Sequence, residues 1–265
     1  MKKLYFIAFI LTGLFSTAQT TDASGKKQGY WKQKDEKTNK LVYEGEFKDD
    51  KPIGKFKYYY PSDSVRAIID FKKNGKTAYA KLFHPTGKRM GEGKYTYEAL
   101  NAMNRDSVWL FYDDAGILIS KDKYINGKKD GVCYVYLPDG KVAEEKTYKL
   151  DVLNGPFKQY FDGKLLKGQG TYTNGLLEGK TSYYFPNGIE VASGYYLHDK
   201  KKGPWIYKDE SGKIKEKELY IDGKLASKKE TEEFFNKNKT KETPKDGATK
   251  ETPKKVGDPK KGTKK

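Results

Sequence analysis

The sequence predicts an all-β fold, an elongated antiparallel β-hairpin solenoid whose hairpins stack into one twisted sheet. Three observations carry this prediction. Glycines followed by an aromatic residue recur at a fixed spacing, turn sequences recur between them, and rings occupy equivalent positions in successive copies. The composition agrees, because 27 glycines and 14% aromatic residues suit short strands and tight turns better than helices.

Eight anchor residues, most of them glycine, define the repeat. Their successive spacings along the chain are 25, 24, 29, 24, 24, 24 and 24, and the recurring value sets the length of one unit. The spacing of 29 indicates a unit with an insertion near 98–105. Two copies are degenerate, because Ala or Ser replaces the glycine. The anchors are Gly29, Gly54, Ala78, Ser107, Gly131, Gly155, Gly179 and Gly203.

Each unit is predicted to form one hairpin, with its first strand after the anchor. Turn sequences such as Pro138-Asp139-Gly140 and Pro186-Asn187-Gly188 end that strand, and a second turn such as Asn174-Gly175 leads to the next anchor. Proline sets the turn φ, and Asn-Gly or Asp-Gly supplies positive φ. A single hairpin cannot bury its apolar side alone, so the units over 29–225 are expected to seal one another.

Two files of rings follow from the repeat. The residues two positions after each anchor, the core file, are mostly bulky and are expected in the core: Trp31, Phe56, Ala80, Trp109, Cys133, Phe157, Thr181 and Trp205. The residues five positions after, the tyrosine file, are Tyr59, Phe83, Tyr112, Tyr136, Tyr160 and Tyr184, with lysine in the two terminal units. The tyrosine file is either core with its hydroxyls at the edge or an exposed face. In the second case it is the candidate interaction surface.

The start of the chain, over 1–18, has the pattern of an export signal. Lys2 and Lys3 precede an apolar run over 4–15, which is too short for a membrane span, and Ser16-Thr17-Ala18 suits cleavage before Gln19. An uncleaved anchor is the alternative. We therefore expect an exported protein, periplasmic or extracellular, in which 19–28 is a linker.

The end of the chain departs from the repeat. Residues 226–239 are predicted to form a charged cap or a short C-terminal helix, and the Lys-, Thr- and Pro-rich tail over 240–265 is expected to be disordered. The formal net charge is +17. Lysine can serve solubility and protect sheet edges. An anionic membrane surface or a cell-wall polymer is the alternative target of this charge, whereas nucleic acid is not expected for an exported protein.

The units resemble MORN repeats (membrane occupation and recognition nexus). The residues that carry the resemblance best are Tyr43, Gly45 and Phe47, followed by Gly54, Phe56 and Tyr58. Later copies are similar to the variant of bacterial exported proteins, some of them described as antitoxin-like. The resemblance spans 29–225 and implies a repeat scaffold. A toxin as the partner is implied by the resemblance alone.

No catalytic, cofactor or metal constellation is expected. His84 and His198 occupy different phases of the repeat, where solvated turn residues are the simplest interpretation. Adjacent carboxylates on a strand point to opposite faces and cannot flank one bond. The lone Cys133 is expected to fill a small buried space. The first hypothesis is therefore a non-catalytic exported scaffold for a protein partner. The alternatives are a module that binds lipid or glycan at the cell envelope and an antitoxin-like protein.

Overall fold

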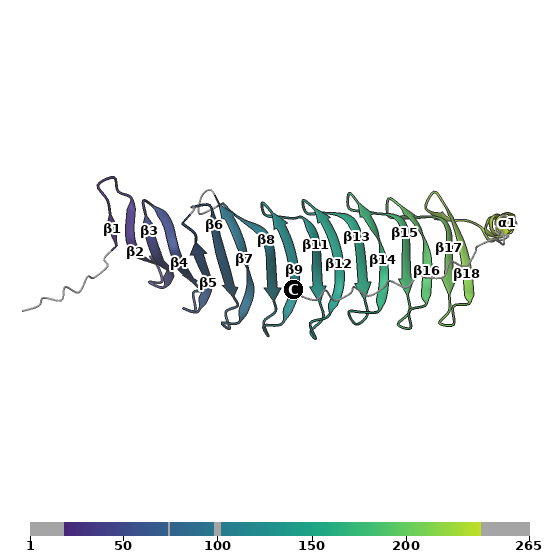
Figure 1. The fold of residues 1–265 in the computed structure, drawn as a ribbon, viewed down its shortest axis with the longest axis horizontal. Helices are drawn as coiled ribbons and strands as arrows, with labels where there is room; N and C mark the ends of the chain where they lie inside the picture. Colours follow the sequence, from purple (N-terminus) through teal and green to yellow (C-terminus); the bar gives the residue numbers. More distant parts are fainter. Residues whose placement is uncertain (1–18, 74, 98–101, 240–265) are drawn as a thin grey trace, which may run out of the picture. The chain divides into compact units, whose positions relative to one another are not determined.

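A computed structural model describes residues 19–73, 75–97 and 102–239. It divides into two units, one up to Leu225 and one from Ala226. The first unit is a single open sheet of 19 strands, all paired antiparallel, and successive strands of the chain lie side by side (Figure 1). The predicted all-β hairpin solenoid is confirmed. The predicted signal over 1–18 and the tail over 240–265 lie outside the described residues.

Two strands form each hairpin of the sheet. The strands are β1 (Thr20–Thr21), β2 (Lys27–Lys34), β3 (Leu41–Lys48), β4 (Lys51–Tyr59), β5 (Val65–Phe71), β6 (Thr77–Phe83), β7 (Arg89–Tyr97), β8 (Met103–Tyr112), β9 (Leu118–Ile125), β10 (Lys128–Lys129), β11 (Gly131–Tyr136), β12 (Val142–Lys149), β13 (Val152–Tyr160), β14 (Leu166–Thr173), β15 (Leu176–Tyr184), β16 (Glu190–Leu197), β17 (Lys200–Lys208), β18 (Ile214–Ile221) and β19 (Lys224–Leu225). Strands β10 and β11 are two parts of one line, since both pair with β9.

The anchors lie inside the first strand of each hairpin, not before it as predicted from the sequence. Strand β4, for example, begins at Lys51, three residues before Gly54. Opposite this anchor the register jumps from the pair Glu44–Lys57 to the pair Glu46–Ile53, so two extra residues bulge out of β4. Gly54 takes φ +64° there, in the left-handed region that glycine enters without strain.

The left-handed φ at the bulge explains why most anchors are glycine. The two anchors that are not glycine test this explanation. Ser107 keeps both the bulge and a left-handed φ of +60°. Ala78 has neither, and β5 and β6 pair in unbroken register up to it. An L-residue with a Cβ resists the left-handed region. Ala78 leaves the strand regular, whereas Ser107 adopts the left-handed region in spite of its Cβ.

The core file lies on one face of the sheet and is buried there except at Trp31, which is half-buried; Trp109 is 0% exposed and Trp205 1%. A one-layer sheet can bury such rings because they lie flat on glycines of the preceding strand. A Cβ built on Gly93 would stand 2.4 Å from the ring of Trp109, and one on Gly194 would stand 2.3 Å from that of Trp205. Where the core file holds the small residue Ala80, its partner on the preceding strand is the large Ile69 instead of glycine.

The turns between units use positive φ at two successive residues, the geometry of a type I′ hairpin. Asn-Gly sequences supply it in some units. In others the second residue is aspartate, as in Leu150-Asp151, with φ +49° and +73°. The carboxylate then accepts a hydrogen bond from the backbone of the preceding hairpin: Lys27 N to Asp50 (2.8 Å), Lys129 N to Asp151 (2.7 Å) and Leu177 N to Asp199 (2.6 Å).

Two segments differ from the regular hairpins. The segment 19–28, where the sequence predicts a linker, contains β1 and the start of β2, which pair with each other. The predicted insertion near 98–105 falls partly on 98–101, which lie outside the described residues. Its remainder enters β8, which begins at Met103.

The second unit contains the helix α1 (Lys228–Lys239), so a short C-terminal helix is confirmed. A capping box begins it. Ser227 donates its hydroxyl and its backbone N–H to Glu230, at 2.7 and 2.8 Å, and the Glu230 N–H returns a hydrogen bond to the Ser227 hydroxyl. Within the described ranges, no helix is both long and apolar enough to cross a membrane.

Candidate interaction faces

The sheet has two faces of different chemistry, because side chains alternate along a strand and cross-strand partners share a side. Residues two and four positions after each anchor point to the face that carries the core file, which we name the aromatic face. Residues one, three and five positions after each anchor point to the other side. This second side carries the tyrosine file, and we name it the tyrosine face.

A third file of rings lies on the aromatic face, and the sequence reasoning missed it. Each of the eight anchors pairs across the hairpin with an aromatic residue, at a nearly constant offset along the chain. The file is Phe47, Phe71, Tyr95, Tyr124, Tyr148, Tyr172, Tyr196 and Tyr220. Its rings pack on the core file, for example Phe47 on Phe56 at 5.0 Å between centroids. The nearly constant distance along the chain between each anchor and its aromatic partner could have revealed this file from the sequence.

The aromatic face also holds cations from the protein itself. All three tryptophans lie beside a cation placed two residues before the anchor: Lys27 over Trp31 at 4.8 Å, Arg105 over Trp109 at 5.2 Å and Lys201 over Trp205 at 4.6 Å. Burial lowers the pKa of Lys201, but its hydrogen bonds with the Tyr207 and Tyr220 hydroxyls outweigh burial and raise it. The cations over these three tryptophans come from the protein itself, so the cation–π contacts stabilise the sheet.

The tyrosine face brings together the six predicted candidates, Tyr59, Phe83, Tyr112, Tyr136, Tyr160 and Tyr184. All are half-buried, and most of their hydroxyls are committed to a residue of the preceding hairpin. Tyr59 donates to Glu44 (2.6 Å), Tyr112 to Glu92 (2.9 Å) and Tyr160 to Glu145 (2.8 Å), while Tyr184 accepts from Gln169 (2.8 Å).

These hydrogen bonds change the acidity of both partners. Burial and the hydrogen bond to Glu145 raise the pKa of Tyr160 to about 12. The hydrogen bond from Tyr59 holds the pKa of Glu44 below its usual value. Phe83 has no hydroxyl, and Ile68 stands where the other units place the polar partner. The file therefore joins consecutive hairpins and leaves its ring edges at the surface.

The tyrosine face contains a recess over β4–β8, of about 600 Å³. Its floor is apolar, and lysines stand around it. Tyr79 is 55% exposed and Val108 44%, and both lie in this one hollow. The lining residues are Lys55, Lys57, Ile68, Asp70, Tyr79, Ala80, Lys81, Glu92, Gly93, Val108 and Leu110.

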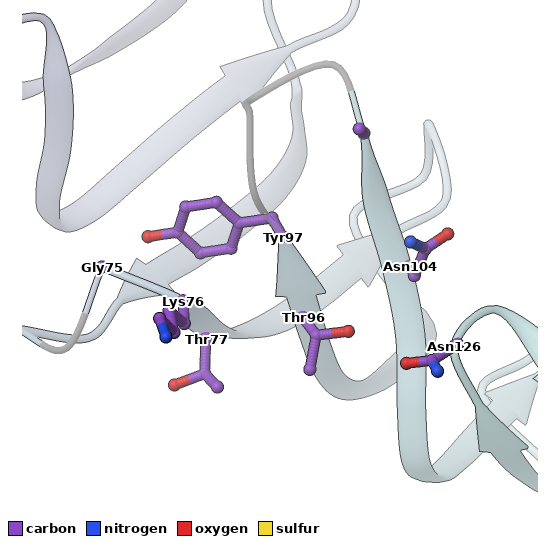
Figure 2. A pocket seen from close by; sticks show the side chains of 8 residues that line it. Gly75, Lys76, Thr77, Thr96, Tyr97, Asn104 and Asn126 are labelled. Carbon is purple, nitrogen blue, oxygen red and sulfur yellow. The ribbon is translucent and has the colours of Figure 1, made fainter.

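A second pocket of about 930 Å³ lies beside the insertion, and lysine, threonine and asparagine residues are among those that line it. Figure 2 shows Tyr97 extending toward Lys76, while Asn104 and Asn126 lie beyond Thr96. The Tyr97 hydroxyl is buried and makes no hydrogen bond within the described part of the chain. It is shielded from solvent, so a bound molecule could not reach it without a rearrangement.

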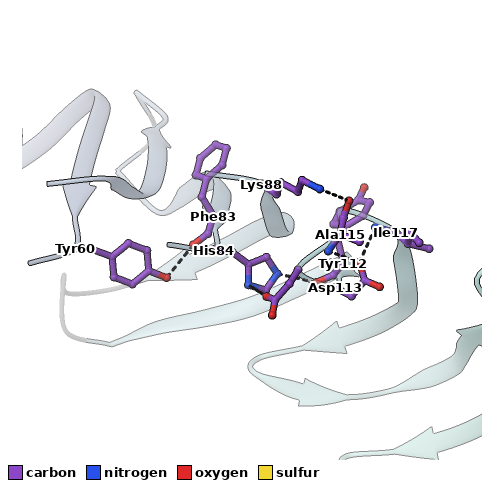
Figure 3. Close-up of polar contacts among 9 residues, drawn as sticks. Tyr60, Phe83, His84, Lys88, Tyr112, Asp113, Ala115 and Ile117 are labelled. Carbon is purple, nitrogen blue, oxygen red and sulfur yellow. Dashed lines mark hydrogen bonds and ion pairs between the residues drawn. The ribbon is translucent and has the colours of Figure 1, made fainter. Parts of the chain in front are cut away.

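His84 is not the solvated turn residue that the sequence predicts. Its side chain is 15% exposed, and Nδ1 lies 2.7 Å from a carboxylate oxygen of Asp114 in the next hairpin. The ring Nε2 is 3.1 Å from the carbonyl oxygen of Tyr112 (Figure 3). Tyr60 adds a similar link by donating to the Phe83 carbonyl at 2.9 Å. His84 thus connects consecutive turns, whereas His198 is 68% exposed, as predicted.

The geometry shows little that could support chemistry. Across 19–73, 75–97 and 102–239, no group of three or more His, Cys, Asp or Glu side chains is arranged to hold a metal ion. Cys133 is buried, as predicted, and burial raises the pKa of its thiol. The fold and its faces define a β-hairpin repeat protein with one self-filled face and one face that carries an open recess.

Comparison with known families agrees with this class. The MORN repeat variant matches residues 52–73, 129–150 and 201–222, and the MORN repeat matches 87–99 and 169–190. No curated protein matches the chain. The matched segments are therefore similar to MORN repeats, whose units generally mediate interactions with proteins or membranes.

Proposed function

We propose that this protein is an exported, non-catalytic scaffold that binds a protein partner on its tyrosine face. The observation that carries the proposal is the difference between the two faces. Rings and cations of the chain itself fill the aromatic face, whereas the tyrosine face keeps a recess with exposed Tyr79 and Val108. Exposed apolar side chains gathered in one hollow are typical of an interaction site.

Site-specific photocrosslinking in intact cells tests which face binds. Val132 and Val135 are 40% and 46% exposed on the same strand, one on the tyrosine face and the other on the aromatic face. With a photoreactive phenylalanine at either position, we expect a discrete adduct from position 132 and none from position 135. Equal adducts from both positions, or an adduct from position 135 alone, would contradict the proposal.

Export is a separate part of the proposal, supported by the basic start, short apolar run and small-residue site of 1–18. We expect the mature chain to begin at Gln19. Mass spectrometry of the N-terminal peptide, together with fractionation of the cells, checks this. An intact Met1 in a cytoplasmic fraction would reject export while leaving the binding face to be judged by crosslinking.

A further inference from the structure

We propose that the recess over β4–β8 binds an extended acidic peptide segment whose apolar side chains enter between the lysines. The inference rests on the proposed function, because it gives the chemistry of the partner at the tyrosine face. Three observations carry it: an apolar floor, an unbalanced positive rim, and the position of the recess in the two degenerate units.

The floor offers the contacts that anchor a side chain. Ile68 and Leu110 are half-buried, and Val108 stands more open beside them. Tyr79 is the most exposed apolar residue of the recess at 55%, and Lys72 lies over its ring at 5.4 Å. A half-exposed tyrosine at the centre of an apolar hollow has the character of a binding hot spot.

The charge that remains unpaired around this floor is positive. The two acids of the lining are already engaged within the protein: Asp70 with Lys72 at 2.6 Å and Glu92 with Arg89 at 2.9 Å. Lys55 and Lys81 are exposed, and among the described residues neither is in an ion pair. Carboxylates of a partner would complement these lysines.

The same charge argues against the chain's own C-terminal tail as the occupant. The tail from residue 226 contains 13 lysines and 7 acidic residues, so it has the same sign as the rim. The volume of about 600 Å³ holds a few side chains, which suits a peptide segment rather than a flat membrane surface.

Part of the recess lining lies outside the segments that match the family. Tyr79, Lys81, Val108 and Leu110 all fall between the matched segments, in 74–86 and 100–128. The unit of Ala78 also lacks the strand bulge found at the other internal anchors. The other units therefore do not reproduce this combination of floor and rim, and we expect one peptide per chain.

Fluorescence anisotropy with the mature full chain tests the proposal. The probe is a fluorescein-labelled decapeptide that alternates Glu and Leu. Peptides in which Lys replaces every Glu, or Ser every Leu, serve as comparisons. Two recess variants, Tyr79→Ser and Lys81→Glu, should each weaken binding about tenfold or more.

Matched controls lie on the same face outside the recess. Tyr195 is 53% exposed, and Lys158 stands three residues after its anchor, as Lys81 does. We expect Tyr195→Ser and Lys158→Glu to change the affinity less than about twofold. All four side chains are exposed, so thermal denaturation should show nearly unchanged stability.

Several results would overturn the proposal. These are equal binding of the Lys-containing peptide, losses in the controls as large as in the recess variants, and full binding by Tyr79→Ser together with Lys81→Glu. Binding to vesicles of phosphatidylglycerol and phosphatidylcholine that depends on both recess residues would assign the site to a membrane instead. If the adduct from position 132 survives Tyr79→Ser and Lys81→Glu, the proposed function stands and this inference falls.

Discussion

Replacing Gly194 by alanine tests how a one-layer sheet buries its rings. The new Cβ would stand 2.3 Å from Cε2 of Trp205, so the ring or the strand has to move. Trp205 is 1% exposed, its indole N–H donates to the Tyr195 carbonyl at 3.2 Å, and Lys201 lies 4.6 Å from its ring. The ring is therefore held on several sides and cannot shift without losing contacts.

The structure sets limits on the cost. If the ring only shifts, overpacking costs about 1–3 kcal/mol. If it is expelled, about 200 Å² of aromatic surface returns to water, worth about 5 kcal/mol at about 25 cal/mol per Å². We expect Gly194→Ala to lower the free energy of unfolding by about 2–5 kcal/mol.

A second glycine supplies the control. Gly179 has φ +79°, and nothing lies within 4 Å of a Cβ built on it. Gly179→Ala therefore costs only the left-handed strain, about 1–2 kcal/mol. The chain also suggests a double variant that should recover stability. At the positions equivalent to Gly194 and Trp205, an earlier unit pairs Ile69 with Ala80. Gly194→Ile combined with Trp205→Ala copies that exchange and should be more stable than the sum of its single changes, by about 1–3 kcal/mol.

Urea denaturation followed by circular dichroism measures these free energies. Hydrogen exchange of β16–β18 shows whether the loss is local, as expected in a repeat protein whose units contact only their neighbours. The reasoning is refuted if Gly194→Ala costs no more than Gly179→Ala. It is also refuted if the effects of the Gly194 and Trp205 changes simply add.

Three further predictions concern other parts of the sheet. Ser107 is a non-glycine anchor at φ +60°, so Ser107→Gly should raise the free energy of unfolding by about 1 kcal/mol and the melting temperature by about 3 °C; an unchanged or lower value would show that the serine is not strained. The pKa of Tyr160 is about 12 in the folded protein against 10 ordinarily, so its stabilisation is complete below pH 10 and is lost as the pH rises toward 12. Tyr160→Phe should flatten the decline of stability between these values in urea titrations, and an unchanged slope would contradict the raised pKa of Tyr160. Lys201→Met should cost about 1–3 kcal/mol by thermal denaturation while leaving peptide binding at the recess unchanged.

The repeat itself could be predicted because its spacing reflects a backbone requirement. A left-handed φ at the bulge requires glycine at the same point of almost every unit, so Gly131, Gly155 and Gly179 recur at equal intervals along the chain. The core file follows from the same register. Local sequence was enough here because one backbone conformation and one face of one strand decide both features.

The partners of the tyrosine file could not be predicted in this way. Tyr59 and Glu44 are 15 residues apart, as are Tyr160 and Glu145, and each pair meets only when one hairpin stacks on the next. His84 and its partner Asp114 are separated by more of the chain still, because they lie on turns of different units. Sequence reasoning placed the tyrosine hydroxyls at an edge or an exposed face and His84 in a turn, where solvent is the default partner. The stacking of turns supplies a protein partner instead.

The third file shows a different limit, because its signal was available. Its aromatic residues follow the anchors as regularly as the core file does, but they lie on the returning strand, 17 or 18 residues after each anchor. Pairing explains the offset. The glycine anchor has no side chain, so a large ring opposite it can approach the backbone closely.

The recess lies at the two units that break the repeat pattern. A regular repeat places equivalent residues in every unit, so a unique site requires units that break the pattern. Ala78 removes the bulge from its strand, and Tyr79 and Lys81 flank the residue Ala80 that replaces a core ring. The sheet stays continuous through these units, and the recess lies on its tyrosine face there. Binding specificity in this protein is therefore expected at the degenerate units, while the regular units supply the rigid sheet that holds them.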